Sequence, residues 1–204
     1  MAAYITAKEI ELRKKAHISL ARYLMNKDDS YGLLVHRKSF FVGSILLDCM
    51  PTFLTRRHTI SQTFPVLKKE LVKLIEDYDA QKGVNIYYCR HLGIITHYIA
   101  DYFTFPHNEV FKGGFRQHNS YEELQKRFIK HYLESGEADV ARIDHPELKS
   151  ADDILTFIKQ AHDKYINVAK EVINDCMYIV GICCVVVESI LAIFMSKEAD
   201  LCFL

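Results

Sequence analysis

The sequence predicts an all-α protein in which residues 1–204 form a single compact multi-helix domain. Apolar residues recur at spacings of three and four along most of the chain, which is the period of one face of an α-helix. No stretch alternates apolar and polar residues as a half-buried strand would. Half of the residues are apolar and a quarter are charged, so the chain has ordinary globular composition and is long enough to bury a core.

The first four helices are expected near residues 5–26, 36–49, 65–80 and 85–104. Prolines delimit three of them, because proline is tolerated at the start of a helix and disrupts its interior. Pro51 follows the apolar run of the second helix, and Pro65 is placed at the start of the third. Pro106 ends the fourth helix. The third helix has a clear apolar stripe: Phe64, Leu67, Leu71, Leu74, Ile75 and Tyr78.

Three more helices are expected near residues 119–135, 151–174 and 176–196, the sixth following a polar linker that contains Pro146. Ser150, with Asp153 three residues later, predicts a capping box at the start of the sixth helix. The last helix, from Met177 to Met195, is apolar on all sides, which is typical of a helix buried in the core.

Met177–Met195 is also nearly long enough to cross a bilayer. Glu188 lies near its centre, and a carboxylate there would be costly in lipid, so we expect no integral membrane span. In a buried helix Glu188 must be paired, protonated or functional. It would then form a hydrogen bond with a buried tyrosine or histidine, or orient an imidazole that binds a metal.

Charge and cysteine content bear on partners and location. The 26 lysines and arginines balance 26 aspartates and glutamates, which argues against a broad nucleic-acid surface, so no stable nucleic-acid partner is expected. The six cysteines show no paired spacing of the zinc-finger or disulfide kind. Met1–Lys15 lacks the apolar segment of a signal peptide. Together these features predict a reducing, cytoplasmic setting.

Histidines and carboxylates gather in the stretch that begins at His97. His97 and Asp101 are four residues apart on a predicted helix, so their side chains project from one face. Pro106 then breaks the helix and leaves His107 on a loop that can fold back.

His118 and Glu122 repeat the four-residue spacing and share a face if the fifth helix already runs through them. Ser120 and Glu123 could instead form a capping box, which would leave His118 outside the helix. Imidazole nitrogens and carboxylate oxygens are the ligands that zinc takes when thiolates are absent. Taken alone, these residues leave open a metal site or ordinary solvated helix faces. The remaining histidines are assigned to structural roles: His36, His91, His131, His145 and His162.

The same stretch resembles the signature of the zinc-dependent phospholipase C family, in which His-Tyr-x-Gly/Thr-Asp precedes a proline and a further histidine. The matching residues are His97, Tyr98, Asp101, Pro106 and His107. A later histidine–glutamate pair matches His118 and Glu122, while an upstream aspartate and histidine match Asp48 and His58. A histidine near the N-terminus matches His17. The resemblance spans residues 16–123.

The resemblance implies an all-α fold that holds two zinc ions, with a third less complete. One zinc would be bound by Asp48, His58, His97 and Asp101, and a second by His107, His118 and Glu122. Asp101 would also bridge to the third zinc, which His17 binds. Asp48 and Asp101 are the candidate catalytic carboxylates. Asp48 would be either a ligand or the group that orients or deprotonates the attacking water.

The chain departs from the family pattern at several positions. It contains no tryptophan, whereas the secreted enzymes of the family complete the third zinc site with a mature N-terminal tryptophan. Ala100 replaces the usual glycine or threonine, the proline comes one residue late, and Asn108 follows His107 directly. These departures leave the matching ligand residues unchanged and indicate a distant, non-secreted branch of the family.

The predicted function is zinc-dependent hydrolysis of a phosphodiester, for which clustered zinc ions are chemically suited. The phosphoester substrate could be a phospholipid, a soluble phosphodiester or a nucleotide, since the related single-strand-specific zinc nucleases share the helical scaffold. Two alternatives stay open. One is a non-catalytic helical protein that keeps the metal for stability. The other is a membrane protein anchored by Met177–Met195.

Overall fold

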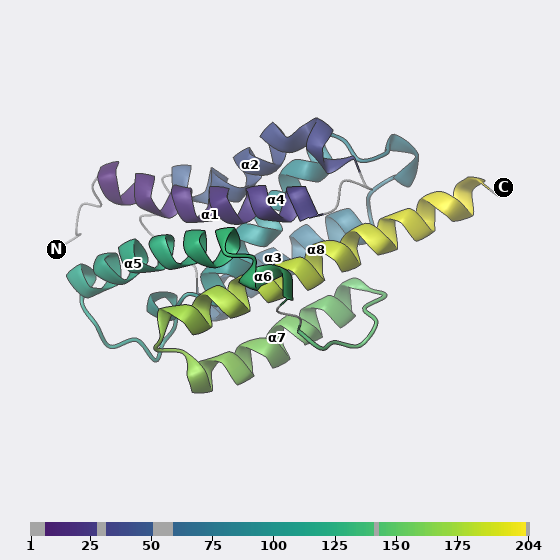
Figure 1. Cartoon of the computed structure of the whole chain (residues 1–204). Coiled ribbons are helices and arrows are strands. Elements are labelled where there is room, and N and C mark those ends of the chain that lie inside the picture. The colour runs from purple at the N-terminus through teal and green to yellow at the C-terminus, as the bar shows by residue number, and fades with distance from the viewer. Residues whose placement is uncertain (1–6, 28–31, 51–58, 141–142, 203–204) are drawn as a thin grey trace.

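The computed structural model describes residues 7–27, 32–50, 59–140 and 143–202, with the backbone alone for 7–13 and 201–202. All secondary structure in these ranges is helical, which confirms the predicted all-α class (Figure 1). The longer helices are α1 (Ala7–Lys27), α2 (Arg37–Leu46), α3 (Ile60–Ile75), α4 (Ile86–Tyr102), α5 (Phe115–Glu134), α7 (Ala151–Val168) and α8 (Val172–Cys202). The short ones are η1 (Leu33–His36), η2 (Leu47–Cys49), η4 (Ala80–Lys82), η5 (Phe105–His107) and α6 (Glu137–Val140).

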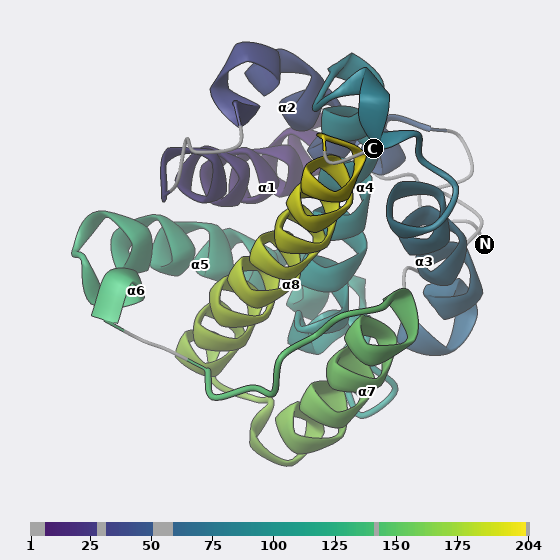
Figure 2. The same ribbon diagram turned by 90° about the vertical axis from the view of Figure 1, so that its right-hand side faces the viewer.

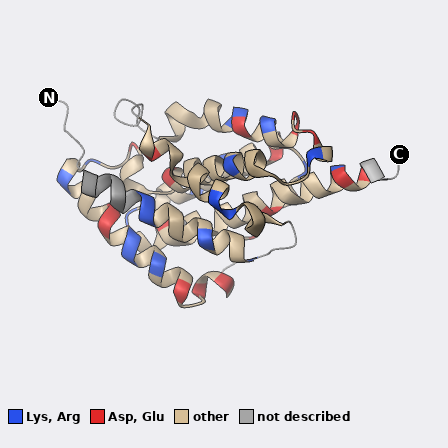
Figure 3. Ribbon diagram, turned by 90° about the horizontal axis from the view of Figure 1, so that it is seen from above, with Lys and Arg blue, Asp and Glu red and all other residues tan. Residues whose placement is uncertain are grey.

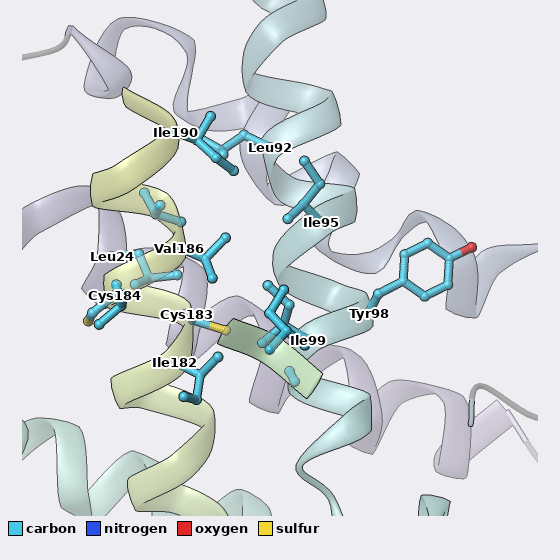
Figure 4. Close-up of a cluster of buried hydrophobic side chains, with 14 of the residues drawn as sticks. Leu24, Leu92, Ile95, Tyr98, Ile99, Ile182, Cys183, Cys184, Val186 and Ile190 are labelled. Atoms are coloured by element: carbon cyan, nitrogen blue, oxygen red, sulfur yellow. The ribbon is translucent and has the colours of Figure 1, made fainter. Parts of the chain in front are cut away.

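The core lies around α4 and α8. Nearly all of α4 is buried, and its apolar side chains face those of α8 (Figure 4). The facing residues include Leu92, Ile95 and Ile99 of α4 with Ile182, Val186 and Ile190 of α8. In Figure 2, α8 crosses the centre of the molecule, with α1 and α5 on one side, α3 on the other and α7 below. The C-terminal helix is therefore buried, as expected.

By length and composition α8 could cross a membrane over Val172–Asp200, and it is the one such helix among the described residues. Its charged residues gather toward the C-terminal end (Figure 3). Inside the protein, 67% of its most apolar stretch is buried, and core helices of other proteins meet the same criterion. The absence of a membrane span stays a prediction.

Glu188 lies on the outer face of α8. Its side chain is 54% exposed, and its Oε1 is 2.9 Å from Nζ of Lys27 on α1. The expectation of a buried carboxylate bound to a tyrosine or histidine is therefore wrong, because α8 has a solvent-facing position here. Lys27 follows His17 by ten residues, or about 15 Å along a helix, so Glu188 is not placed to orient that imidazole.

The third helix begins earlier than expected. α3 starts at Ile60, so Pro65 lies inside the helix and removes one backbone hydrogen bond. The helix persists because its apolar face, including Leu67 and Leu71, is fully buried. Further along, the predicted cap of α7 is confirmed: the backbone N–H of Asp153 donates to Ser150 Oγ at 3.1 Å.

The fifth helix also begins earlier than expected. α5 starts at Phe115, where the Gln117 side chain accepts a hydrogen bond from the Gly114 N–H at 2.8 Å. The alternative start with a capping box at Ser120 is therefore wrong. His118 lies inside the helix as a result.

Two glycines allow α2 and α4 to pack backbone against backbone. A Cβ on Gly43 would lie 2.0 Å from the Arg90 carbonyl oxygen, and one on Gly93 would lie 2.3 Å from the Phe40 carbonyl oxygen. Neither fits without a shift of the backbone. Because Gly43 precedes Ser44, this close approach brings the end of α2 against the middle of α4.

Candidate metal centre

Four of the predicted ligands meet where α1, η2 and α4 converge. His17 comes from α1, Asp48 from η2, and His97 and Asp101 from successive turns of α4. Asp101 Oδ2 is 3.2 Å from His97 Nε2, and its Oδ1 is 3.5 Å from His17 Nε2. The Asp48 oxygens lie 3.9 Å from the same two imidazole nitrogens. The His17 and His97 rings are stacked, with centroids 4.1 Å apart. We call these four residues the first group.

The second group consists of His107, His118 and Glu122. Glu122 Oε1 lies 2.8 Å from His118 Nε2, one turn earlier on α5, and 3.1 Å from His107 Nε2. His107 reaches this position because Pro106 turns the chain into η5 directly after α4. The early start of α5 matters here, because it places His118 and Glu122 on one helical face.

His107 and Asp101 join the two groups. The Nδ1 atom of His107 is 3.4 Å from Asp101 Oδ1, while its Nε2 faces Glu122. Within each of the sets His17–His97–Asp101 and His107–His118–Glu122, one ligand atom per residue lies within 4.8 Å of the others. The arrangement is one continuous polar cluster enclosed by α1, α4 and α5, of which α1 and α5 lie side by side (Figures 1 and 2).

The backbone of α2 orients His97. Nδ1 of His97 lies 2.8 Å from the carbonyl oxygen of Ser44. A carbonyl oxygen only accepts, so Nδ1 carries the proton and donates. In the neutral ring, Nε2 therefore has its lone pair directed at the carboxylates. Histidines that bind metals commonly hold their second nitrogen in this way.

The cluster is strongly shielded from water. His97 is fully buried, and Asp48 and Asp101 are each 4% exposed. Burial lowers the pKa of His97, but the nearby charges of Asp101 and Asp48 outweigh burial and raise it to about 9. In the metal-free protein this imidazole is therefore protonated at neutral pH and acts as the counter-ion of the two carboxylates.

Two buried atoms indicate that a cation fits this cluster. Asp48 Oδ2 and His107 Nδ1 have no hydrogen-bond partner among the described residues. Unpartnered buried polar atoms are costly and therefore uncommon, and a cation bound among these carboxylates and imidazoles would satisfy Asp48 Oδ2. Imidazole nitrogen and carboxylate oxygen are the donor atoms that zinc prefers in the absence of thiolates. The residues present thus fit zinc chemically.

Residues 16–172, more than three quarters of the chain, match the zinc-dependent phospholipase C family. The chain belongs to this family. No curated protein and no solved structure matches it. The zinc-dependent phospholipase C match and the two ligand groups agree on a metal-dependent phosphoesterase at the level of the family.

Seven of the eight residues that the resemblance assigned to zinc in this phospholipase C relative lie in the two groups. They are His17, Asp48, His97, Asp101, His107, His118 and Glu122. The eighth, His58, lies outside the described residues. Two histidines assigned to structure have buried partners: His91 pairs with Glu70 of α3, and His162 with Asn108.

Three features of this phospholipase C-like site escaped the sequence reasoning. The Ser44 carbonyl orients the His97 ring, and the Asn108 side-chain amide donates to the carbonyl oxygens of Tyr102 and Thr104. Asp175, in the first turn of α8, accepts hydrogen bonds from η5 and α5. The one sequence signal for Asp175 is a carboxylate just ahead of the apolar run Met177–Met195.

Proposed function

We propose that this chain is a zinc-dependent phosphodiesterase that binds two zinc ions, one in each ligand group. The observation that carries the proposal is the continuity of the two groups through Asp101 and His107. Adjacent metal sites suit phosphodiester hydrolysis, because both the attacking and the leaving oxygen need stabilisation, and here the contact between Asp101 and His107 holds the two groups side by side. A third ion would depend on His17 and on ligands beyond the two groups.

Zinc bound here would supply Lewis acidity and a water molecule that ionises near neutral pH. The chain's own residues have separate tasks. Asp101 holds the imidazoles of His17, His97 and His107 around one carboxylate. Asp48 enters from η2, and its Oδ2 atom has no hydrogen-bond donor among the described residues. Asp48 is therefore placed either to bind the ion through this atom or to accept a proton from the attacking water.

The test combines metal content with turnover. Purified protein is analysed for zinc by elemental analysis and then assayed on a chromogenic phosphodiester with and without chelator. We expect two zinc ions per chain and activity that chelator abolishes and added zinc restores. Asp101→Asn should lose at least one zinc and at least about 100-fold in activity, because it removes the charge shared by three imidazoles.

Asp152→Asn is the matched control. Asp152 pairs with Lys68 on the surface, and its side chain is 79% exposed, so the same chemical change should alter neither zinc content nor turnover. Full activity in Asp101→Asn would refute the site. Stoichiometric zinc without turnover of any phosphodiester would indicate the non-catalytic alternative.

The substrate class within the phosphodiesters, the cytoplasmic location and the absence of a nucleic-acid partner stay predictions. The even balance of acidic and basic residues supports the last of these. Assaying the active enzyme on phospholipid vesicles, a soluble phosphodiester and single-stranded DNA would rank these substrates.

A further inference from the structure

Asp175 is a fully buried carboxylate in the first turn of α8, away from the two ligand groups. It accepts four hydrogen bonds. The Tyr165 hydroxyl donates to its Oδ1 at 2.7 Å. Three donors converge on Oδ2: the Phe105 backbone N–H at 2.9 Å, the Tyr121 hydroxyl at 2.9 Å and the Gln125 side-chain amide at 3.2 Å. Burial raises the pKa of Asp175 to about 6, whereas its hydrogen bonds lower it.

The three donors on Oδ2 belong to the segments that carry the second group. Phe105 begins η5 and precedes His107 by two residues. Tyr121 directly precedes Glu122 on α5, and Gln125 follows Glu122 by one helical turn. One carboxylate oxygen thus ties η5 to α5 behind the point where His107, His118 and Glu122 meet. The Phe105 and Tyr121 rings also contact each other, with centroids 5.7 Å apart.

Asp175 is the charged acceptor that these three donors share. Phe105 N–H lies at the start of a three-residue helix, where no carbonyl of the preceding turn accepts it. Loss of the acceptor would leave that part-buried N–H unsatisfied, at a cost that favours movement of η5. Movement of η5 carries His107 away from Glu122. The first group depends less directly on η5, because its residues come from α1, η2 and α4 and only Asp101 contacts His107.

We propose that Asp175 is a positioning residue for the second metal site, acting through η5 and α5 on His107, His118 and Glu122. Asp175 lies beyond residues 16–172, which match the family, so this anchor is contributed by the C-terminal helix. The inference rests on the proposed metal centre, and its test therefore measures zinc affinity as well as turnover.

The sharpest variants are a matched pair of tyrosines. Tyr121→Phe and Tyr165→Phe each delete one hydroxyl that donates to the same carboxylate, but only Tyr121 lies on a helix that bears ligands. Zinc affinity is measured by competition with a chelator of known affinity. We expect Tyr121→Phe to weaken the second zinc about 10-fold, in the range seen when groups that orient ligands are removed. Tyr165→Phe should weaken binding of the second zinc less than about threefold relative to the wild-type protein.

Substitutions of Asp175 itself give the larger effect. Asp175→Leu removes the acceptor and should weaken the second zinc about 100-fold, leaving the first unchanged. Asp175→Asn keeps one carbonyl oxygen, which can still accept from Phe105, and should recover most of the affinity. His118→Ala identifies which ion is lost, since it removes a ligand of the second group alone.

Two results would overturn the role of Asp175, and a third would overturn the proposed function. Equal zinc affinity in Tyr121→Phe and Tyr165→Phe would overturn the inference, and so would unchanged affinity in a folded Asp175→Leu. If Asp175→Leu fails to fold, the tyrosine pair still provides the test. Wild-type protein that binds fewer than two zinc ions would instead overturn the proposed function.

Discussion

His97 shows how neighbouring groups decide what a single side chain can do. Its Nδ1 donates to the Ser44 carbonyl, so one nitrogen and one ring orientation are left for a ligand. Its Nε2 faces Asp101 and Asp48, whose charges keep the metal-free ring protonated despite complete burial. A zinc ion would replace that proton as the counter-ion of the two carboxylates.

Zinc binding at pH 7 should therefore release protons. The pKa of His97 in the metal-free protein is raised to about 9, whereas zinc binds the neutral imidazole. Titration calorimetry at pH 7 in buffers of different ionisation enthalpy should show release of about one proton from this residue. The release should fall as pH rises through 9, because His97 is increasingly neutral above its pKa. An apparent binding enthalpy independent of the buffer would contradict this assignment.

The packing of α2 on α4 shows how two helices place the groups of the site. Gly43 and Gly93 bring the helix backbones into direct contact, which sets the Ser44 carbonyl against His97. η2 continues directly from α2, so the same contact also places Asp48 beside α4. The distance between two helices thus controls both the orientation of one ligand and the position of another.

Gly93→Ala should force α2 away from α4, because its Cβ would lie 2.3 Å from the Phe40 carbonyl oxygen. We expect a loss of about 1–3 kcal/mol in the free energy of unfolding, as for other overpacked sites. Zinc affinity at the first group should fall in parallel. Gly114→Ala is the control for steric space, since nothing lies within 4 Å of its Cβ and its expected cost is limited to the smaller one of alanine at the N-cap of α5. Denaturant unfolding and zinc titration of both variants provide the measurement, and equal stability would refute the argument.

In the whole molecule, the ligand groups connect segments that are far apart in the chain. The candidate ligands come from α1, η2, α4, η5 and α5, while Asp175 of α8 accepts hydrogen bonds from η5 and α5. Without a metal, the cluster keeps buried carboxylates near protonated imidazole and two unpartnered buried atoms. A bound ion should therefore stabilise the packing of α1 against α4 and α5.

Chelation should lower the thermal unfolding temperature of the protein. A ligand that binds only the folded state at a free concentration 100 times its Kd contributes about 2.7 kcal/mol. We expect a loss of this order when zinc is removed, measured by calorimetry with and without chelator. Asp101→Asn should respond much less, because its site is already impaired. An unfolding temperature that chelator leaves unchanged would show that zinc does not support the fold.

Most of the helices and part of the candidate metal centre could be predicted from local patterns in the sequence. The three-to-four spacing of apolar residues located most of the helices, and His97 with Asp101 followed from their one-turn separation. Pro65 led to a predicted start of α3 that is five residues late. The helix already begins at Ile60, because burial of its apolar face outweighs the one backbone hydrogen bond that Pro65 removes. The prediction that Glu188 is buried beside a tyrosine or histidine was wrong, because its side chain lies on the outer face of α8 and pairs with Lys27.

The order of apolar residues, the four-residue pairs and the break at Pro106 are local properties, so they could be interpreted along the chain. Whether His17 and Asp48 join the cluster depended on how α1 and α2 pack on α4, which local spacing does not encode. The same holds for Asp175, because one of its four donors is ten residues away along the chain and the other three are fifty or more residues away. Contacts between distant segments arise from side-chain packing in three dimensions, and only the tertiary structure decided them.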